Sequence, residues 1–215
     1  MKQISHCQLY TFIDTLYLAG RGPADLARHL CDGGADVVQL RAKNSTREEL
    51  LRMAEAILPV TRAAGVPLVI NDDLVVAQQI GAEYCHLGQE DFFNAGRRQV
   101  SDLFRANEPV VRIGLSSHSP EQAARALAAG AEYLGVGPVY PTGTKPEARP
   151  VTLDYVRWAA ANVKIPWFAI GGVNLKTLDQ VVAAGAKRIC VVSAILDTAD
   201  VAGACREFKR RLPPL

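Results

Sequence analysis

The sequence has no long hydrophobic run, no low-complexity segment and no large excess of either charge. No stretch of about 18 consecutive apolar residues occurs, and the N-terminus lacks the apolar core of an export signal, so we expect neither a membrane span nor export. The 24 Lys and Arg residues against 22 Asp and Glu give a formal charge of +2, which argues against a nucleic-acid partner. With 49% apolar residues among 215, the chain is predicted to form one globular domain over residues 1–215.

The five cysteines lack the spacing of a metal or redox site. They are scattered along the chain with no CxxC pair, and there are only four histidines to stand beside them. This pattern predicts reduced, buried thiols in a cytoplasmic protein and argues against structural zinc. A homo-oligomer is compatible with the sequence.

A repeated junction organises the chain. A Gly-Ala pair precedes an apolar run at residues 34–35, 81–82, 130–131 and 185–186, as expected where a helix ends in a glycine cap and a strand follows. Three other apolar runs begin with proline, which is allowed at the first residue of a strand. Together with the first apolar run, these predict eight strands at 7–13, 36–40, 67–70, 83–87, 109–113, 132–136, 166–170 and 187–191.

Helical periodicity fills the intervals between the strands. The predicted helices are 24–33, 46–64, 74–80, 97–104, 120–129, 153–161, 175–184 and 201–211. Eight strand-helix units with nearly continuous apolar strands indicate a parallel (β/α)8 barrel, a TIM barrel, although an open doubly wound sheet shows the same alternation. We favour the barrel because its eight paired units need no edge strand, and we expect function at the carboxyl ends of the strands.

Polar residues collect at those predicted ends. Gln39, Arg41 and Lys43 alternate after the second strand and would share one face. Asn71, Asp72 and Asp73 end the third strand, and Glu90 and Asp91 follow the fourth. Acidic clusters on neighbouring strand ends suit Mg²⁺, which is usually held by one or two carboxylates and completes its shell with substrate phosphates and water. One of Asp72 and its neighbour Asp73 could instead cap the next helix.

The later strand ends suit phosphate binding. Ser116 and His118 follow the fifth strand, and the loop after the sixth carries hydroxyls and a cation suited to an anion, at Thr142, Gly143, Thr144 and Lys145. The pair Gly171 and Gly172 follows the seventh strand, and Val192 and Ser193 follow the eighth, at loops where barrels of this kind often bind phosphate. For His86, inside an apolar run, we favour a hydrogen-bonded core histidine over a functional residue. The inventory indicates two bound anionic groups, one complexed with Mg²⁺.

Several segments together resemble thiamine phosphate synthases, from about residue 9 to residue 210. These are QLRAK at 39–43, ND at 71–72, HLGQED at 86–91, GPVYPTGTK at 137–145, AIGG at 169–172 and VSAI at 192–195. The resemblance implies a transferase that joins 4-amino-5-hydroxymethyl-2-methylpyrimidine diphosphate to a thiazole phosphate or its carboxylated form. Its products would be thiamine phosphate and diphosphate.

The resemblance also implies a role for each matching residue. Asp72 and Asp91 would bind Mg²⁺, and Lys145, Arg41 and Ser116 would be catalytic. The pyrimidine diphosphate would contact Gln39, Leu40, Arg41, Ala42, Lys43, Asn71, Ser116 and Lys145. The thiazole phosphate would contact Thr142, Gly143, Thr144, Gly172, Val192 and Ser193.

Three alternatives stay open at this point. A related thiazole tautomerase would use a histidine at the position of His118 to move protons. A sugar-phosphate isomerase on the same barrel would not need the pair Asp72 and Asp91. A non-catalytic protein could use the same scaffold merely to bind a phosphorylated molecule.

Overall fold

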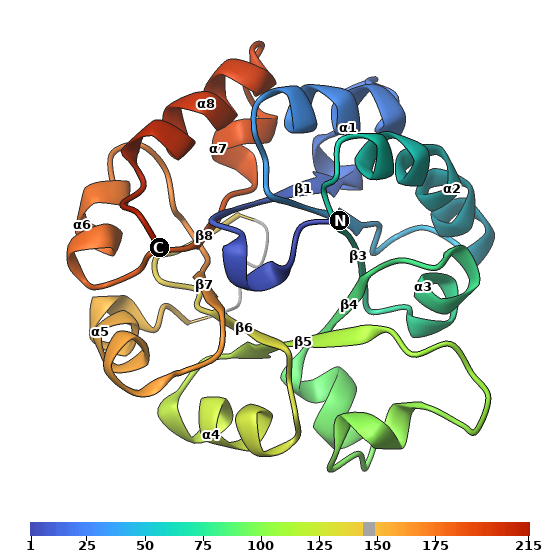
Figure 1. Cartoon of the computed structure of the whole chain (residues 1–215). Coiled ribbons are helices and arrows are strands. Elements are labelled where there is room, and N and C mark those ends of the chain that lie inside the picture. The colour runs from blue at the N-terminus through green and yellow to red at the C-terminus, as the bar shows by residue number, and fades with distance from the viewer. Residues whose placement is uncertain (144–148) are drawn as a thin grey trace.

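Eight parallel strands close into a barrel in the computed structural model, which describes residues 1–143 and 149–215 (Figure 1). Each strand pairs with the next in sequence, and the last closes on the first, where Tyr10 lies opposite Cys190. This order confirms the predicted (β/α)8 barrel and excludes the open sheet. The strands are β1 (Leu9–Asp14), β2 (Val37–Arg41), β3 (Leu68–Asn71), β4 (Tyr84–Leu87), β5 (Arg112–Ser117), β6 (Tyr133–Val136), β7 (Trp167–Ala169) and β8 (Ile189–Cys190).

Helices surround the barrel on its outer face (Figure 1). The predicted helix-to-strand junctions are confirmed, since Gly34, Gly81, Gly130 and Gly185 all have φ between 69° and 101°, the left-handed region that glycine adopts readily. Within the described residues, no helix is long and apolar enough to cross a membrane. The α-helices are α1 (Pro23–Asp32), α2 (Arg47–Ala63), α3 (Leu74–Ile80), α4 (Pro120–Ala128), α5 (Thr152–Asn162), α6 (Leu178–Ala183), α7 (Ser193–Leu196) and α8 (Val201–Arg211).

The fourth strand-helix unit differs from the prediction. Residues 97–104 form no α-helix; the segment between β4 and β5 instead holds a π-helical turn, η3 (Glu90–Asn94), and a 3-10 turn, η4 (Val100–Leu103). The Asp102 carboxylate accepts hydrogen bonds from the backbone N–H groups of Arg98 and Gln99, which stabilises a single turn. A side chain that caps a turn locally competes with a longer helix.

The fifth and eighth strands also differ from the prediction. The fifth strand begins at Arg112 rather than Pro109, since Val110 is 79% exposed, and it extends to Ser117 through pairing with β6. The eighth strand has two residues, and the short helix α7 after it was not predicted. The extension of the fifth strand places Ser116 within the strand rather than in the loop after it.

Aromatic rings fill the barrel interior below the site. The ring of Tyr10 lies 5.2 Å from that of Phe168 and 5.9 Å from that of Tyr133, measured between centroids. At the amino ends of the strands, a 3-10 turn, η1 (Ile4–His6), lies over the barrel (Figure 1), and the Ile4 N–H donates to the Tyr84 hydroxyl at 3.3 Å. The cavity described next lies at the opposite end.

Candidate active site

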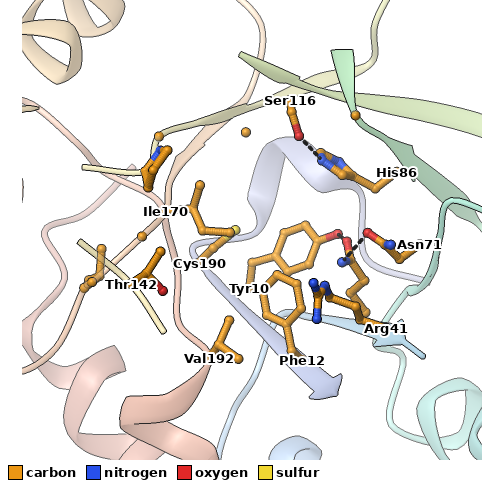
Figure 2. A pocket seen from close by; sticks show the side chains of 18 of the residues that line it. Tyr10, Phe12, Arg41, Asn71, His86, Ser116, Thr142, Ile170, Cys190 and Val192 are labelled. Atoms are coloured by element: carbon orange, nitrogen blue, oxygen red, sulfur yellow. Dashed lines mark hydrogen bonds between the residues drawn. The ribbon is translucent and has the colours of Figure 1, made fainter. Parts of the chain in front are cut away.

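A cavity at the carboxyl ends of the strands is lined by side chains from every strand or the segment that follows it (Figure 2). The sequence placed function at this end, and most of its candidates meet here. The predicted residues that line the cavity are Gln39, Arg41, Lys43, Asn71, Asp72, Asp91, Ser116, Thr142, Gly172, Val192 and Ser193.

Three predicted residues do not line the cavity. Leu40 is fully buried on the other face of β2, since side chains alternate along a strand, and Ala42 packs against the same core. Gly143 is exposed. The remaining two predictions, Thr144 and Lys145, lie outside the described residues.

Arg41 is held by a carboxylate that sequence reasoning missed. Its Nη1 donates to Asp14 Oδ2 at 2.7 Å, and the side chains of Arg41 and Asp14 are 8% and 0% exposed. The other oxygen, Asp14 Oδ1, accepts from the Leu16 N–H at 3.0 Å. Asp14 ends β1 beside Arg41 in the parallel register, so the guanidinium is oriented at the cavity wall. The sequence signal that could have identified Asp14 is its place directly after the first predicted strand, where site residues are expected.

The two aspartates after β3, Asp72 and Asp73, have different roles. Asp73 caps α3, accepting from the Val76 N–H at 3.0 Å, and it pairs with Arg47 at 2.7 Å. Asp72 faces the cavity, where its Oδ2 accepts from Asn71 Nδ2 at 2.5 Å and lies 3.7 Å from Lys43 Nζ. The capping alternative therefore applies to Asp73, and Asp72 is left at the site.

Asp91 lines the same cavity from the π-helical turn after β4. Its position depends on Gly88, because a Cβ atom there would lie 2.5 Å from Asp91 Oδ2. Gln89 is buried and braces the turn, with Nε2 donating to the Ser116 carbonyl and Oε1 accepting from Arg125 Nη2. Among the described residues, no three His, Cys, Asp or Glu side chains gather in a group that could hold a metal ion.

Backbone contacts shape the opposite wall. Gly172 has φ +64°, and a Cβ atom on it would lie 2.6 Å from Tyr140 Cβ and 2.9 Å from the Pro141 carbonyl oxygen. The loop after β6 therefore packs directly on the end of β7, and this brings Thr142 to the cavity. Ser193 begins the short helix α7 at the same wall.

Both cavity histidines are hydrogen-bonded. His86 Nδ1 lies 3.1 Å from the Tyr133 hydroxyl, and its Nε2 lies 3.0 Å from Ser116 Oγ (Figure 2). The prediction of a hydrogen-bonded core histidine is correct in part, since His86 also lines the cavity. His118 Nδ1 contacts the Gly137 carbonyl.

A closed (β/α)8 barrel with carboxylates, cations, hydroxyls and glycine turns in one cavity at its strand ends is typical of TIM-barrel enzymes that act on small phosphorylated molecules. The model of the family described as thiamine monophosphate synthase matches residues 9–195. The chain belongs to this family.

Individual relatives agree with the family match. A thiamine-phosphate synthase from Thermus thermophilus is 47% identical over 182 residues, which are 84% of each chain. One from Acidothermus cellulolyticus is 41% identical over 97% of this chain and 96% of its own. A solved structure, thiamine phosphate pyrophosphorylase from Pyrococcus furiosus, superposes with a TM-score of 0.82 at 28% identity and covers 96% of both chains. The resemblance seen in the sequence is confirmed, and the tautomerase-like and non-catalytic alternatives are not favoured.

Proposed function

We propose that the protein joins 4-amino-5-hydroxymethyl-2-methylpyrimidine diphosphate to a thiazole phosphate, releasing diphosphate and forming thiamine phosphate. The observation that carries this proposal is the convergence of residues from six separated family motifs on one cavity of the barrel. Convergence supports one active site that holds both substrates, as a bimolecular reaction requires.

The two walls of the cavity suit different substrates. Gln39, Lys43 and Asn71, with Ser116 across the lumen, would hold the pyrimidine diphosphate. Thr142, Gly172, Val192 and Ser193 would hold the thiazole phosphate, with the backbone at Gly172 open to close approach.

The reaction would begin with cleavage of the bond between the pyrimidine methylene carbon and the diphosphate oxygen. The electron pair leaves with diphosphate, and the ring amino group delocalises the positive charge that remains on the methylene carbon. The thiazole nitrogen then donates its lone pair to that carbon. Arg41, oriented by Asp14, would stabilise the charge that develops on the leaving oxygen, and Lys145 would act with it.

The carboxylates of Asp72 and Asp91 fit Mg²⁺. Both offer hard carboxylate oxygens to the same cavity from neighbouring strand ends, and Asp73 is occupied elsewhere. Mg²⁺ is usually bound by one or two carboxylates together with substrate phosphates, so two protein carboxylates are sufficient. When bound, the ion would neutralise charge on the diphosphate.

A direct assay tests the proposed activity. Incubation with both substrates and Mg²⁺ should yield thiamine phosphate, detected by mass. Isomerisation of the thiazole alone would indicate the tautomerase, conversion of a sugar phosphate would indicate the isomerase, and binding of phosphates without product would indicate a non-catalytic protein.

Replacement of Asp91 tests the proposed metal site. We expect Asp91→Ala, and likewise Lys145→Ala, to lower turnover by orders of magnitude and leave the fold intact, because each removes charge that stabilises the leaving diphosphate. The matched control is Asp154→Ala, which removes an 88% exposed carboxylate from α5 and should leave turnover unchanged. Turnover like that of the unsubstituted protein in folded Asp91→Ala at limiting Mg²⁺ would contradict the role of Asp91.

Ligand-induced stabilisation gives a second test of the metal site. Mg²⁺ together with diphosphate should raise the melting temperature more than either alone, since ligands that bind the native state stabilise it in proportion to RT ln(1 + [L]/Kd). Asp91→Ala should lose the joint effect. Equal shifts in the variant and the unsubstituted protein would place the binding elsewhere.

We also propose a reducing compartment such as the cytoplasm for this protein. All five cysteines are free, and burial raises the pKa of the Cys7 and Cys205 thiols to about 12. Such thiols are unreactive as nucleophiles at neutral pH. A thiol reagent should modify Cys7 and Cys205 only after unfolding.

A further inference from the structure

A continuous series of side-chain hydrogen bonds crosses the barrel along the wall of the cavity, which all of its members line, and we call it the lumen chain. Its links are 2.5, 3.1, 2.6, 2.9, 3.1 and 3.0 Å long in order. Figure 2 shows the links at Asn71 and between His86 and Ser116. The members in order are Asp72, Asn71, Gln39, Tyr10, Tyr133, His86 and Ser116, from β3, β2, β1, β6, β4 and β5 and, for Asp72, from the residue after β3.

The direction of the lumen chain is fixed at its acidic end. Asn71 Nδ2 donates to Asp72 Oδ2, which accepts, so the amide nitrogen of Asn71 points toward Asp72. Its Oδ1 then faces Gln39, which must donate from Nε2. The remaining amide oxygen, Gln39 Oε1, therefore faces the Tyr10 hydroxyl and accepts from it. Each amide orientation follows from the one before it.

The two tyrosines carry the same direction across the lumen. Tyr10 has one hydroxyl proton, which it donates to Gln39, so Tyr133 must donate its own proton to the Tyr10 oxygen. Burial raises the pKa of both hydroxyls well above the ordinary value of 10.0, and both phenols keep their protons. The Tyr133 oxygen is then left to accept from His86 Nδ1.

The direction ends at Ser116. In the neutral form of an imidazole one ring nitrogen donates and the other accepts, so with Nδ1 of His86 donating to Tyr133, its Nε2 would accept from the Ser116 hydroxyl 3.0 Å away. The single proton of Ser116 is therefore directed at His86. Ser116 also lines the cavity, so its Oγ would be left to accept a hydrogen bond there.

We propose that Tyr10, Tyr133 and His86 are positioning residues that hold Ser116 as a hydrogen-bond acceptor for the pyrimidine substrate. The inference rests on the proposed function. The exocyclic amino group is the only N–H donor of that substrate, so Ser116 Oγ would accept its hydrogen bond from this amino group. An acceptor on this N–H favours release of nitrogen electrons into the ring as diphosphate departs. The lumen chain thus selects a pyrimidine that carries an amino group over one with a carbonyl at the same place.

The protonation pattern of His86 is measured without any substrate. The ¹⁵N shifts of a histidine-labelled protein distinguish the Nδ1–H and Nε2–H forms, and His86→Gln assigns the signal among the four histidines. We expect the Nδ1–H form in the unsubstituted protein and loss of that form in Tyr133→Phe, which keeps the buried ring but removes the acceptor. An Nε2–H form in the unsubstituted protein overturns the proposal, whether or not the protein makes thiamine phosphate.

Tyr84→Phe provides the matched control. Tyr84 is also a buried tyrosine of the barrel, and its hydroxyl bonds to Ile4 and Arg112 at the amino ends of the strands, outside the lumen chain. Its replacement should lower the melting temperature and leave the His86 tautomer unchanged. The same tautomer change in both variants would mean that the effect is merely structural.

Kinetics connect the lumen chain to the reaction. Tyr133→Phe should lower kcat/KM for the pyrimidine diphosphate about tenfold, the effect of one buried hydrogen bond, and leave the KM for the thiazole phosphate unchanged. Tyr84→Phe should change neither. If Tyr133→Phe does not fold, Tyr10→Phe breaks the adjoining link. Unchanged kcat/KM in Tyr133→Phe, or an equal loss for both substrates, overturns the positioning role. If the unsubstituted protein makes no product, the proposed function is contradicted. The tautomer measurement then decides on the lumen chain by itself.

Discussion

Asp14 and Arg41 form an ion pair at a place where both side chains are almost completely buried. A lone buried charge is costly, and a partner with satisfied hydrogen bonds reduces that cost. Asp14 meets this condition because one oxygen binds Arg41 and the other binds the Leu16 N–H. The pair can therefore keep a charged guanidinium at the cavity wall before any phosphate arrives.

Replacement of Asp14 tests this arrangement. Asp14→Asn keeps the shape of the side chain but leaves the buried Arg41 without a counter-charge, and we expect it to lower the free energy of unfolding by about 3 kcal/mol or more. Turnover should fall as well, since Arg41 loses its orientation. Urea unfolding and steady-state assays check both effects. In the matched exposed pair on α5, Asp154→Asn should cost about 0 to 1 kcal/mol, and an equally small cost for Asp14→Asn would contradict the argument.

The site residues that could be predicted from the sequence are those marked by a pattern within a few residues of the chain. Gln39, Arg41 and Lys43 alternate along one strand end, and all three line the cavity as expected. Asp14 and Tyr133 escaped because their importance comes from partners far along the chain: Asp14 binds a residue 27 positions away, and Tyr133 meets one 123 positions away. Such pairs exist only once the barrel closes, and no local periodicity encodes them.

At the scale of elements, the loop after β6 and the end of β7 depend on each other. The Tyr140 N–H donates to the Gly171 carbonyl at 3.1 Å, and the Val139 N–H donates to the Ile170 carbonyl at 2.8 Å. Because Gly172 has no side chain, the two segments can lie closer together than a Cβ atom at this position would allow. The wall that would bind the thiazole phosphate is thus built by backbone contact between two segments.

Gly172→Ala should separate these segments. The added Cβ atom meets Tyr140 Cβ and the Pro141 carbonyl, and φ +64° is itself unfavourable for alanine, so we expect a loss of stability of about 1 to 3 kcal/mol. The KM for the thiazole phosphate should rise more than the KM for the pyrimidine diphosphate. Gly20→Ala is the control: it has a positive φ of 80° but no atom within 4 Å of the new Cβ. Equal effects on both KM values would contradict a wall specific to the thiazole phosphate.

The order and type of most elements could be predicted, because each Gly-Ala or proline signal acts within a few residues. The exact ends of the elements depended instead on residues that are distant in the sequence and pair with them in the fold. Ser116 and Ser117 are polar and read as a loop in sequence, yet they extend β5 because Gly135 and Val136 pair beside them. Residues 97–104 show the reverse: a helix was predicted there, and the structure has one 3-10 turn that Asp102 caps.

At the scale of the whole molecule, one buried carboxylate joins the two ends of the chain. Asp36, 4% exposed, accepts hydrogen bonds from Lys209 Nζ at 2.6 Å and from the backbone N–H groups of Gln8 and Leu9, and it also pairs with Lys2. It therefore ties the N-terminal segment, the start of β1 and α8 together beneath the barrel. This network lies at the end opposite the cavity, so it can change stability without touching the site.

Asp36→Asn should reveal this network through its pH dependence. Burial alone would raise the pKa of Asp36, but the hydrogen bonds from Lys2 and Lys209 outweigh it and hold the pKa below the ordinary value of 3.8. The charged carboxylate therefore stabilises the fold above about pH 4, and this contribution is lost as the pH falls through the lowered pKa. We expect the variant to be less stable by about 3 kcal/mol at pH 7, with a gap that narrows toward pH 3.

Unfolding in urea at several pH values measures that gap directly. Asp179→Asn is the control, because Asp179 also pairs with an arginine of α8 but is 76% exposed, so its variant should differ by about 1 kcal/mol or less at every pH. Turnover of Asp36→Asn at a temperature where it is fully folded should match that of the unsubstituted protein, since the network lies at the other end of the barrel from the cavity. A gap that stays constant down to pH 3 would mean that the Asp36 charge does not hold the chain ends together.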